Sequence, residues 1–188
     1  ICVEDPLREE AADAVRELKE AGITKVVMMT GDSERTAAAI AKRVGVDEYY
    51  SEVLPEDKAS FVEKEKELGH KVIMIGDGIN DSLALSSASV GIAISDGAAI
   101  AREIADVTIS ADNLHEIVTL KRLSTALMKR IHNNYRTIIG INGGLIALGV
   151  TGIIMPTTSA LLHNMSTLTI SLRSMRNLLP KEEEAVSY

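Results

Sequence analysis

A glycine-rich segment with three carboxylate or amide side chains follows the apolar residues 72–75. This segment reads Gly76-Asp77-Gly78-Ile79-Asn80-Asp81, so that its two aspartates are four residues apart. An acidic pair on a turn that enters a helix can bind Mg²⁺ while the ion keeps several of its waters. Two glycines beside an apolar strand reduce stability unless a ligand needs them, and we therefore interpret the segment as functional.

Two further polar groups have the chemistry of a phosphate site. Thr30-Gly31-Asp32 follows the apolar residues 26–29, and Lys58 follows the turn Leu54-Pro55-Glu56-Asp57. A hydroxyl, backbone N–H groups and a lysine together neutralise a phosphoryl group. Taken singly, Thr-Gly-Asp is a common turn and a surface lysine is usually solvated. Beside the glycine-rich segment, they predict a site for phosphate and magnesium.

The elements that must position these residues alternate between short apolar strands and amphipathic helices. This alternation predicts an α/β fold, in which a parallel sheet has helices on both faces and binds its ligand at the carboxyl ends of the strands. We expect strands at 25–29, 49–53, 71–75, 90–94 and 107–109, and helices at 5–20, 33–44, 56–68 and between the last two strands.

Composition excludes some classes of function. The net charge is -7 and no stretch is rich in basic or aromatic residues, which argues against a nucleic-acid partner. Cys2 is the only cysteine, so that neither an internal disulfide nor a cysteine-pair metal site can form. The chain begins with Ile, and we interpret it as a truncation of a longer protein.

The last third of the chain is apolar. Residues 137–172 contain no Asp, Glu, Lys or Arg. One helix of that length would measure about 54 Å, against roughly 30 Å for the hydrocarbon core of a bilayer. The segment Met155-Pro156-Thr157 should therefore turn the chain between membrane spans at about 137–154 and 159–179, after a stalk helix at about 114–134. Basic residues flank both ends of this hairpin, which predicts that both ends are cytoplasmic.

Polar residues recur at helical spacing along the second predicted span. Such a stripe faces protein or a transport pathway rather than lipid. His163 can form an interhelical hydrogen bond or serve as a metal ligand, and imidazole suits divalent transition metals. Asn142 in the first span also needs a polar partner. The stripe consists of Ser159, His163, Ser166, Thr167 and Ser171.

The motifs at Thr30, Leu54 and Gly76 resemble, in order and spacing, the phosphorylation domain of P-type ATPases, a branch of the haloacid-dehalogenase superfamily. The resemblance implies a haloacid-dehalogenase-like fold and an Mg²⁺ site made by Asp77, Asn80 and Asp81. It implies that Thr30 hydrogen-bonds the transferred phosphoryl group, that Lys58 offsets its charge, and that Gly31 and Asp32 shape the loop.

The heavy-metal class of these ATPases gives further expectations. Asp5 and Arg8 are similar to a hinge motif beneath the domain that binds ATP. His163, Asn164 and Ser166 occupy the place of the residues that select the transported metal, and Asn142 on the preceding span is a poorer candidate for the same site. No Asp-Lys-Thr-Gly-Thr motif occurs, so the chain alone should not form the family's aspartyl phosphate.

The resulting prediction is a piece of an ATP-driven pump that exports Zn²⁺, Cd²⁺, Co²⁺ or Mn²⁺ from a multi-pass position in the plasma or inner membrane. Its partners would be membrane lipid and the pump's other domains. Two alternatives are a membrane-tethered phosphatase of the same superfamily and a non-catalytic truncated regulatory chain. The predicted regions are a phosphorylation domain (1–112), a stalk (113–136), two transmembrane helices (137–179) and a cytoplasmic tail (180–188).

Overall fold

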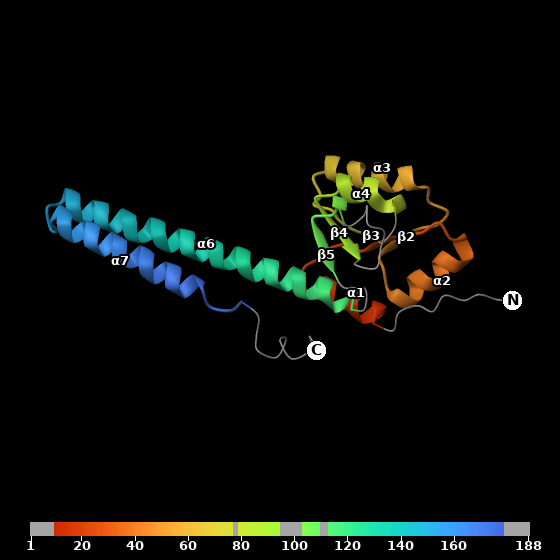
Figure 1. Ribbon diagram of the computed structural model, residues 1–188, viewed down its shortest axis with the longest axis horizontal. Helices are drawn as coiled ribbons and strands as arrows, with labels where there is room; N and C mark the ends of the chain where they lie inside the picture. Colours follow the sequence, from red (N-terminus) through yellow and green to blue (C-terminus); the bar gives the residue numbers. More distant parts are fainter. Residues whose placement is uncertain (1–9, 77–78, 95–102, 110–112, 179–188) are drawn as a thin grey trace. The chain divides into compact units, whose positions relative to one another are not determined.

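The computed structural model describes residues 10–76, 79–94, 103–109 and 113–178. The chain divides into two compact units, residues 1–120 and residues 121–188, and each is described by itself. Helices and strands alternate through the first unit, as the sequence predicts (Figure 1). The predicted helix between the last two strands falls mostly outside the described residues.

Most elements of the first unit begin and end close to the predicted positions, whereas the predicted start of the first helix at residue 5 lies outside the described residues. Its five strands are β1 (Val27–Met29), β2 (Glu48–Tyr50), β3 (Ile73–Gly76), β4 (Val90–Ile94) and β5 (Val107–Ile109). Its helices are α1 (Ala11–Glu20), α2 (Glu34–Val44), α3 (Pro55–Glu67), the short 3-10 helix η1 (Ile79–Asp81) and α4 (Ser82–Ser87).

The strands form two parallel sheets, and the prediction of one continuous sheet is wrong for the described residues. The first sheet pairs β1 with β2, and the second has the order β3-β4-β5. All pairs are parallel, with Val27 opposite Glu48 and Ile73 opposite Val90. The sheets stay separate because no described strand pairs with both β1 and β3.

Helices cover both faces of the three-stranded sheet, because alternate residues of a strand point to opposite faces. On one face, Met74 of β3 packs against Val62 of α3 and Ala84 of α4. On the other face, Ile75 of the same strand packs against Ile92 and Ile117. The carboxyl end of β3 is therefore held between two apolar layers.

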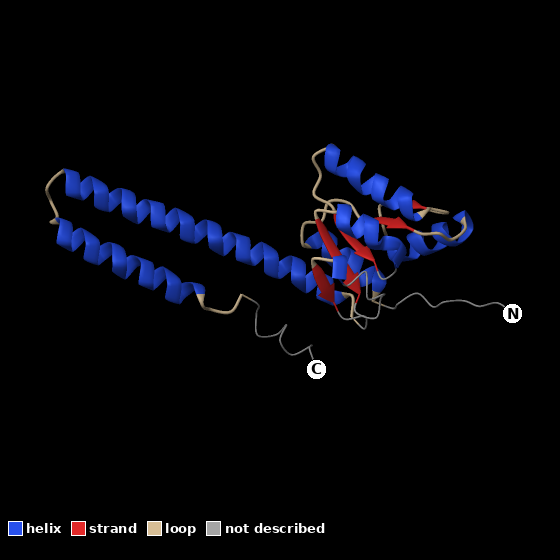
Figure 2. Cartoon of the chain, turned by 45° about the horizontal axis from the view of Figure 1, so that its top comes forward, coloured by secondary structure: helices blue, strands red, loops and turns tan. Residues whose placement is uncertain are grey.

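The second unit is an antiparallel pair of helices (Figure 2). Helix α6 (His115–Val150) begins in the first unit and continues into the second, and α7 (Pro156–Ser174) follows after a short turn. The turn contains Gly152 with φ 74°, and Pro156 takes the first helical position, where its missing N–H is not needed. The predicted break is thus confirmed.

The predicted stalk and the predicted first span are continuous. The stalk and the first span are a single helix of 36 residues, because no proline interrupts the segment and its glycines stay helical. None of the helices in the described part of the chain is both sufficiently long and sufficiently apolar to span a membrane.

Candidate functional site

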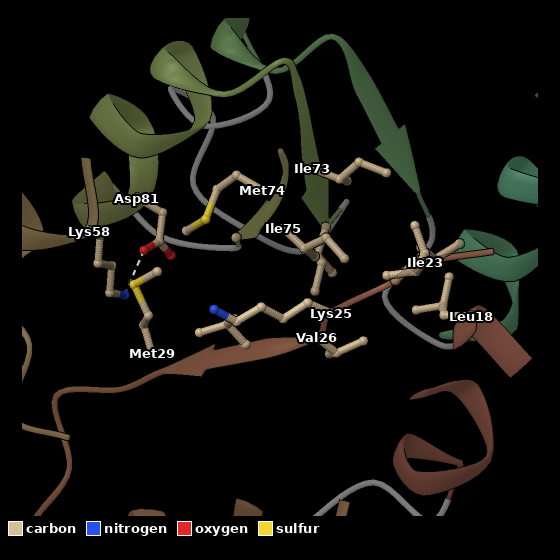
Figure 3. Close-up of a pocket in the computed structure, with 14 residues that line it drawn as sticks. Leu18, Ile23, Lys25, Val26, Met29, Lys58, Ile73, Met74, Ile75 and Asp81 are labelled. Carbon is tan, nitrogen blue, oxygen red and sulfur yellow. Dashed lines mark hydrogen bonds and ion pairs between the residues drawn. The ribbon is translucent and has the colours of Figure 1, made fainter. Parts of the chain in front are cut away.

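A lysine and an aspartate pair where β3 and α3 come together. Lys58 Nζ lies 2.7 Å from Asp81 Oδ1, and the two side chains are only 16% and 11% exposed. Lys58 belongs to the first turns of α3, and Asp81 ends η1 after β3 (Figure 3). Charges that are this little exposed interact more strongly than charges in bulk water. The structure thus brings together two residues that the sequence predicts for one site.

The turn before Lys58 is fixed by its own sequence. Pro55 takes the first position of α3, where its missing N–H has no intrahelical partner to lose. The carboxylate of Asp57 accepts a hydrogen bond of 3.3 Å from the N–H of Leu54, which closes the first turn. Lys58 follows directly and reaches toward Asp81.

Gly76 lies closer to Asp81 than any larger residue could. A Cβ placed on Gly76 would lie 2.6 Å from the Cβ of Asp81 and 2.8 Å from its Oδ2. Sequence reasoning attributed the glycines of this segment to ligand binding. The structure adds a packing reason for Gly76, which is that the end of β3 must leave room for the carboxylate of Asp81.

The Thr30 turn leads from β1 to α2. Thr30 donates its N–H to the carbonyl of Tyr50 at 3.0 Å, and its hydroxyl oxygen accepts the N–H of Asp32 at 3.1 Å. Asp32 is exposed and Thr30 is half-buried. The hydroxyl of Thr30 therefore holds the turn in shape, as expected for a Thr-Gly-Asp loop.

A cavity of about 410 Å³ joins the end of β1 to the Lys58–Asp81 pair. Met29, the last residue of β1, lines this cavity together with Lys58, Asp81 and Gly76 (Figure 3). The carboxyl ends of β1 and β3 therefore border the same cavity. Parallel sheets bind their ligands at this end of the strands.

The donor chemistry of the site suits Mg²⁺. Asp81 and Asn80 offer carboxylate and amide oxygens, the ligand type that this ion prefers. Asp77, the other predicted ligand, lies outside the described residues, as do Asp5 and Arg8. The described residues contain no group of three or more His, Cys, Asp or Glu side chains that could hold a metal ion.

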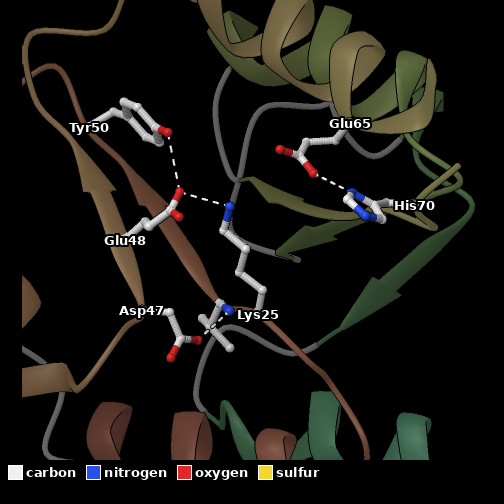
Figure 4. Close-up of polar contacts among 7 residues, drawn as sticks. Lys25, Asp47, Glu48, Tyr50, Glu65 and His70 are labelled. Atoms are coloured by element: carbon white, nitrogen blue, oxygen red, sulfur yellow. Dashed lines mark hydrogen bonds and ion pairs between the residues drawn. The ribbon is translucent and has the colours of Figure 1, made fainter. Parts of the chain in front are cut away.

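Charged contacts fix β1 to β2 next to the cavity (Figure 4). Lys25 Nζ lies 2.8 Å from Glu48 Oε2, and this hydrogen bond raises the pKa of Lys25 and lowers the pKa of Glu48. Asp47 accepts 2.7 Å and 2.8 Å hydrogen bonds from Lys19 Nζ and the N–H of Val26. The bond from Lys19, followed by the one from Val26, lowers the pKa of Asp47.

Polar residues of the hairpin also come together. His163 Nδ1 on α7 lies 2.8 Å from Asn142 Oδ1 on α6. Ser166 donates its hydroxyl to the carbonyl of His163 at 2.7 Å, so that this hydroxyl is used within the helix. Asn164 is exposed. Of the residues predicted for a hairpin site, the structure directly joins the side chains of His163 and Asn142.

Sequence reasoning missed the role of Arg130. It treated Arg130 as one of several flanking cations, whereas the side chain caps the end of α7. Its Nη1 donates to the carbonyl of Ser174 at 2.8 Å and its Nη2 to the carbonyl of Asn177 at 3.2 Å. Asn134 adds a 2.6 Å bond to the hydroxyl of Ser174. Cations favour helix C-termini, but the sequence alone does not say which helix a distant arginine reaches.

Comparison with known proteins places these motifs in a family. The haloacid dehalogenase-like hydrolase family matches residues 1–89. A zinc-exporting P-type ATPase of Mycobacterium marinum is 37% identical over 177 residues, which are 94% of this chain and 24% of that protein. A manganese-exporting P-type ATPase of Mycobacterium tuberculosis is also 37% identical over 177 residues, 94% of this chain and 25% of that protein.

Two further matches are also to P-type ATPases that are named for a metal ion. A probable copper-exporting P-type ATPase V of Mycobacterium tuberculosis is 37% identical over 176 residues, 94% of this chain and 23% of that protein. The crystal structure of a zinc-transporting PIB-type ATPase in its E2.Pi state has a TM-score of 0.86 at 34% identity, and the match covers 94% of this chain and 29% of that chain. The chain spans about a quarter of the length of these relatives. It belongs to the heavy-metal P-type ATPases.

Proposed function

We propose that the chain is part of an ATP-driven pump that exports a divalent transition metal through an aspartyl-phosphate intermediate. The observation that carries this proposal is the pairing of Lys58 with Asp81 at the carboxyl end of β3, in a chain whose relatives are metal-exporting ATPases. The relatives are named for zinc, manganese or copper, so the choice of a divalent ion rests on the imidazole of His163 and on the first two names.

In this proposal, Asp81, Asn80 and Asp77 hold Mg²⁺, which offsets negative charge on the phosphoryl group of ATP. Lys58 supplies a cation beside the same group, and Thr30 with Gly31 supplies donors from the end of β1. Asp32 holds the Thr30 turn, while Asp5 and Arg8 are assigned to the family's hinge motif. Because the chain has no Asp-Lys-Thr-Gly-Thr motif, it does not form the aspartyl phosphate by itself.

We further propose that the hairpin lies in a membrane. Residues 137–172 carry no formal charge, and this stretch is divided between α6, the turn and α7. Large apolar side chains are exposed along both helices, and soluble monomers rarely expose contiguous apolar surface of this kind. They include Ile139, Ile146, Val150, Leu161, Leu168 and Leu172.

The transported ion is proposed to bind to the hairpin at His163 and Asn142. The 2.8 Å contact between their side chains holds the imidazole ring by one nitrogen, as metal-site histidines are usually held. Asn164 and Ser166 complete the proposed ligand set, because the Ser166 hydroxyl donates its hydrogen to the carbonyl of His163 and keeps its oxygen lone pairs for a metal ion.

The experiment is ATP hydrolysis by the full-length protein in detergent with Mg²⁺, measured with Zn²⁺, Cd²⁺, Co²⁺, Mn²⁺ and Cu⁺ in turn. We expect metal-stimulated turnover that Asp81→Asn abolishes and that His163→Ala reduces for particular ions. His132→Ala, which changes another histidine of the hairpin, is the matched control. Turnover that no transition metal stimulates, together with release of phosphate from simple monoesters, would instead identify a phosphatase. The match of residues 1–89 to a hydrolase family favours this alternative.

A further inference from the structure

The cations of the helix pair gather at one end of its paired region. Residues 129–176 contain five Lys or Arg and no Asp or Glu. The five are Lys129, Arg130 and Arg136 of α6, Arg173 in the last turn of α7, and Arg176 just after that helix. Because the helices are antiparallel and joined by the turn before Pro156, all five cations lie at the end of the pair away from this turn.

One of the five cations is used within the pair. Arg130 donates to the carbonyls of Ser174 and Asn177 at 2.8 Å and 3.2 Å. Asn134, one turn further along α6, donates to the hydroxyl of Ser174 at 2.6 Å. These bonds hold the end of α7 against this part of α6, and they therefore fix which residues of the two helices lie at the same level.

The same contacts place Arg136 of α6 and Arg173 of α7 at nearly the same level. In an antiparallel pair, a step forward along one helix corresponds to a step backward along the other. Asn134 lies opposite Ser174. Two positions further along α6, Arg136 therefore lies opposite Leu172, which directly precedes Arg173. At a rise of 1.5 Å per residue, the levels of the two arginines differ by only about 2 Å.

These two arginines have no counter-charge in the described hairpin. Arg136 and Arg173 are both exposed, and within the described residues neither side chain is joined to a carboxylate. The next acidic residue after them in the sequence is Glu182, which lies outside the described residues. Two like charges at one level repel each other, whereas an anion between them is attracted by both.

The two arginines also mark the edge of the uncharged part of the hairpin. They directly flank residues 137–172, which contain no Asp, Glu, Lys or Arg. Tyr135 is 63% exposed, and tyrosines are enriched at the headgroup level of membranes. Nearer the turn, Ile139 is 53% exposed and Leu168 is 54% exposed. Cations and a tyrosine thus lie at one level, with exposed apolar side chains beyond them, and a phospholipid presents its phosphate and its acyl chains in the same order.

We infer that Arg136 and Arg173 together bind the phosphate of an anionic phospholipid, whose acyl chains lie along the apolar side chains toward the turn. A guanidinium group offers phosphate two parallel N–H donors, and here each helix supplies one such group. Lys129 and Arg176 are also exposed and lie nearer the cation-rich end. They add attraction over a distance close to the screening length of about 10 Å.

This inference rests on the proposed membrane location of the hairpin and adds to it a specific class of ligand. A carboxylate from the segment that follows α7, or from the rest of a longer protein, is the competing occupant. It would satisfy the cations but leave the neighbouring apolar side chains uncovered, whereas a phospholipid covers both. The combination of paired arginines with adjoining exposed apolar surface therefore favours the lipid.

The test reconstitutes the 188-residue chain in phosphatidylcholine vesicles, and vesicle flotation first establishes whether the chain is inserted. Electron paramagnetic resonance then compares how strongly the chain immobilises spin-labelled phosphatidylglycerol and spin-labelled phosphatidylcholine. We expect phosphatidylglycerol to be preferred at least about threefold at low salt, because each cation near the bilayer surface attracts anionic lipid. The preference should fall in about 1 M NaCl, where exposed charges are screened.

Paired substitutions assign the preference to the two arginines. Arg136→Gln combined with Arg173→Gln should lower the preference at least about threefold, to near one. Lys42→Gln combined with Arg43→Gln removes the same charge from the exposed end of α2 and is the matched control, which should keep the preference of the parent. The single variants Arg136→Gln and Arg173→Gln should each lower it partly, so that the test does not depend on folding of the double variant.

Four results would overturn the inference. One is an inserted chain without any preference, and another is equal preference in the parent and the Arg136→Gln, Arg173→Gln variant. A preference that appears only in the E182Q/E183Q/E184Q variant would assign the cations to the chain's own acidic residues. Displacement of the labelled lipid by inorganic phosphate, but not by chloride at equal ionic strength, would assign the site to free phosphate.

The proposed function fails separately. An inserted chain that shows one of these four results contradicts the lipid site alone and leaves the pump unaffected. A chain that does not float with the vesicles contradicts both the lipid site and the proposed membrane location. ATP hydrolysis by the full-length protein is measured in detergent and does not depend on either readout.

Discussion

Lys58 and Asp81 are 23 positions apart in the sequence and form a 2.7 Å ion pair in which both side chains are mostly withdrawn from solvent. Lys58→Met removes the cation and leaves a poorly solvated carboxylate. Unfolding of the 188-residue chain should become easier by about 1–3 kcal/mol, as for other buried polar groups that lose a partner. Chemical denaturation at neutral pH measures this. Equal stability of Lys58→Met and the parent would show that the pair is not a structural contact.

In the full-length protein, the same substitution should lower ATP hydrolysis at least about 100-fold, because one positioned charge is lost from the phosphoryl site. Lys58→Arg keeps the charge but changes its geometry, and we expect partial activity from it. If Lys58→Met and Lys58→Arg are equally active, Lys58 does not contact the phosphoryl group.

Gly76→Ala should be destabilising by about 1–3 kcal/mol, since its Cβ would meet Asp81 at 2.6 Å in a packed region. Gly31→Ala provides the matched control, because a Cβ at that glycine meets nothing within 4 Å. Thermal melts of both variants and the parent decide the matter. A Gly31→Ala variant as unstable as Gly76→Ala would attribute the effect to glycine itself rather than to the contact.

Acid should weaken the first unit partly through Asp47. Its pKa is lowered in the folded chain by hydrogen bonds from Lys19 and Val26, so its contribution is complete above the unfolded-state pKa of about 4 and is lost as the pH falls through the lower folded-state value. Asp47→Asn should therefore show a smaller drop in the urea midpoint between pH 5 and pH 3 than the parent. Parallel midpoint curves for the two proteins would contradict this account.

Arg130→Gln should loosen the last turn of α7, where the guanidinium meets the carbonyls of Ser174 and Asn177. A cation that caps a helix C-terminus contributes about 1–2 kcal/mol in partly buried geometry. Hydrogen exchange in detergent should become faster for the amides of residues 170–174. Lys129→Gln, which changes the exposed neighbouring cation, is the control and should leave the exchange of these amides as in the parent.

Local patterns predicted the elements of the first unit well. Strand positions at 90–94 and 107–109 agree with β4 and β5, because short apolar runs between turn residues leave little choice. The predicted break at Met155-Pro156 was equally informative, because α7 begins at Pro156.

Pairing between distant elements was much harder to predict. The division of the strands into two sheets depends on which edges meet, and periodicity within one strand carries no such information. Likewise, nothing near Arg130 in the sequence indicates the end of α7. The contact of Gly76 with Asp81 depends on how η1 folds back on β3, which a motif alone does not define.

The unpaired strand edges of the first unit bear on aggregation. Unpaired strand edges commonly seed fibrils, because each added strand presents a fresh edge to the next. Within the described residues, β1, β2, β3 and β5 each have one edge that pairs with no other strand. Each of these edge strands is only three or four residues long, and such short edges are one means by which proteins restrain edge-to-edge pairing.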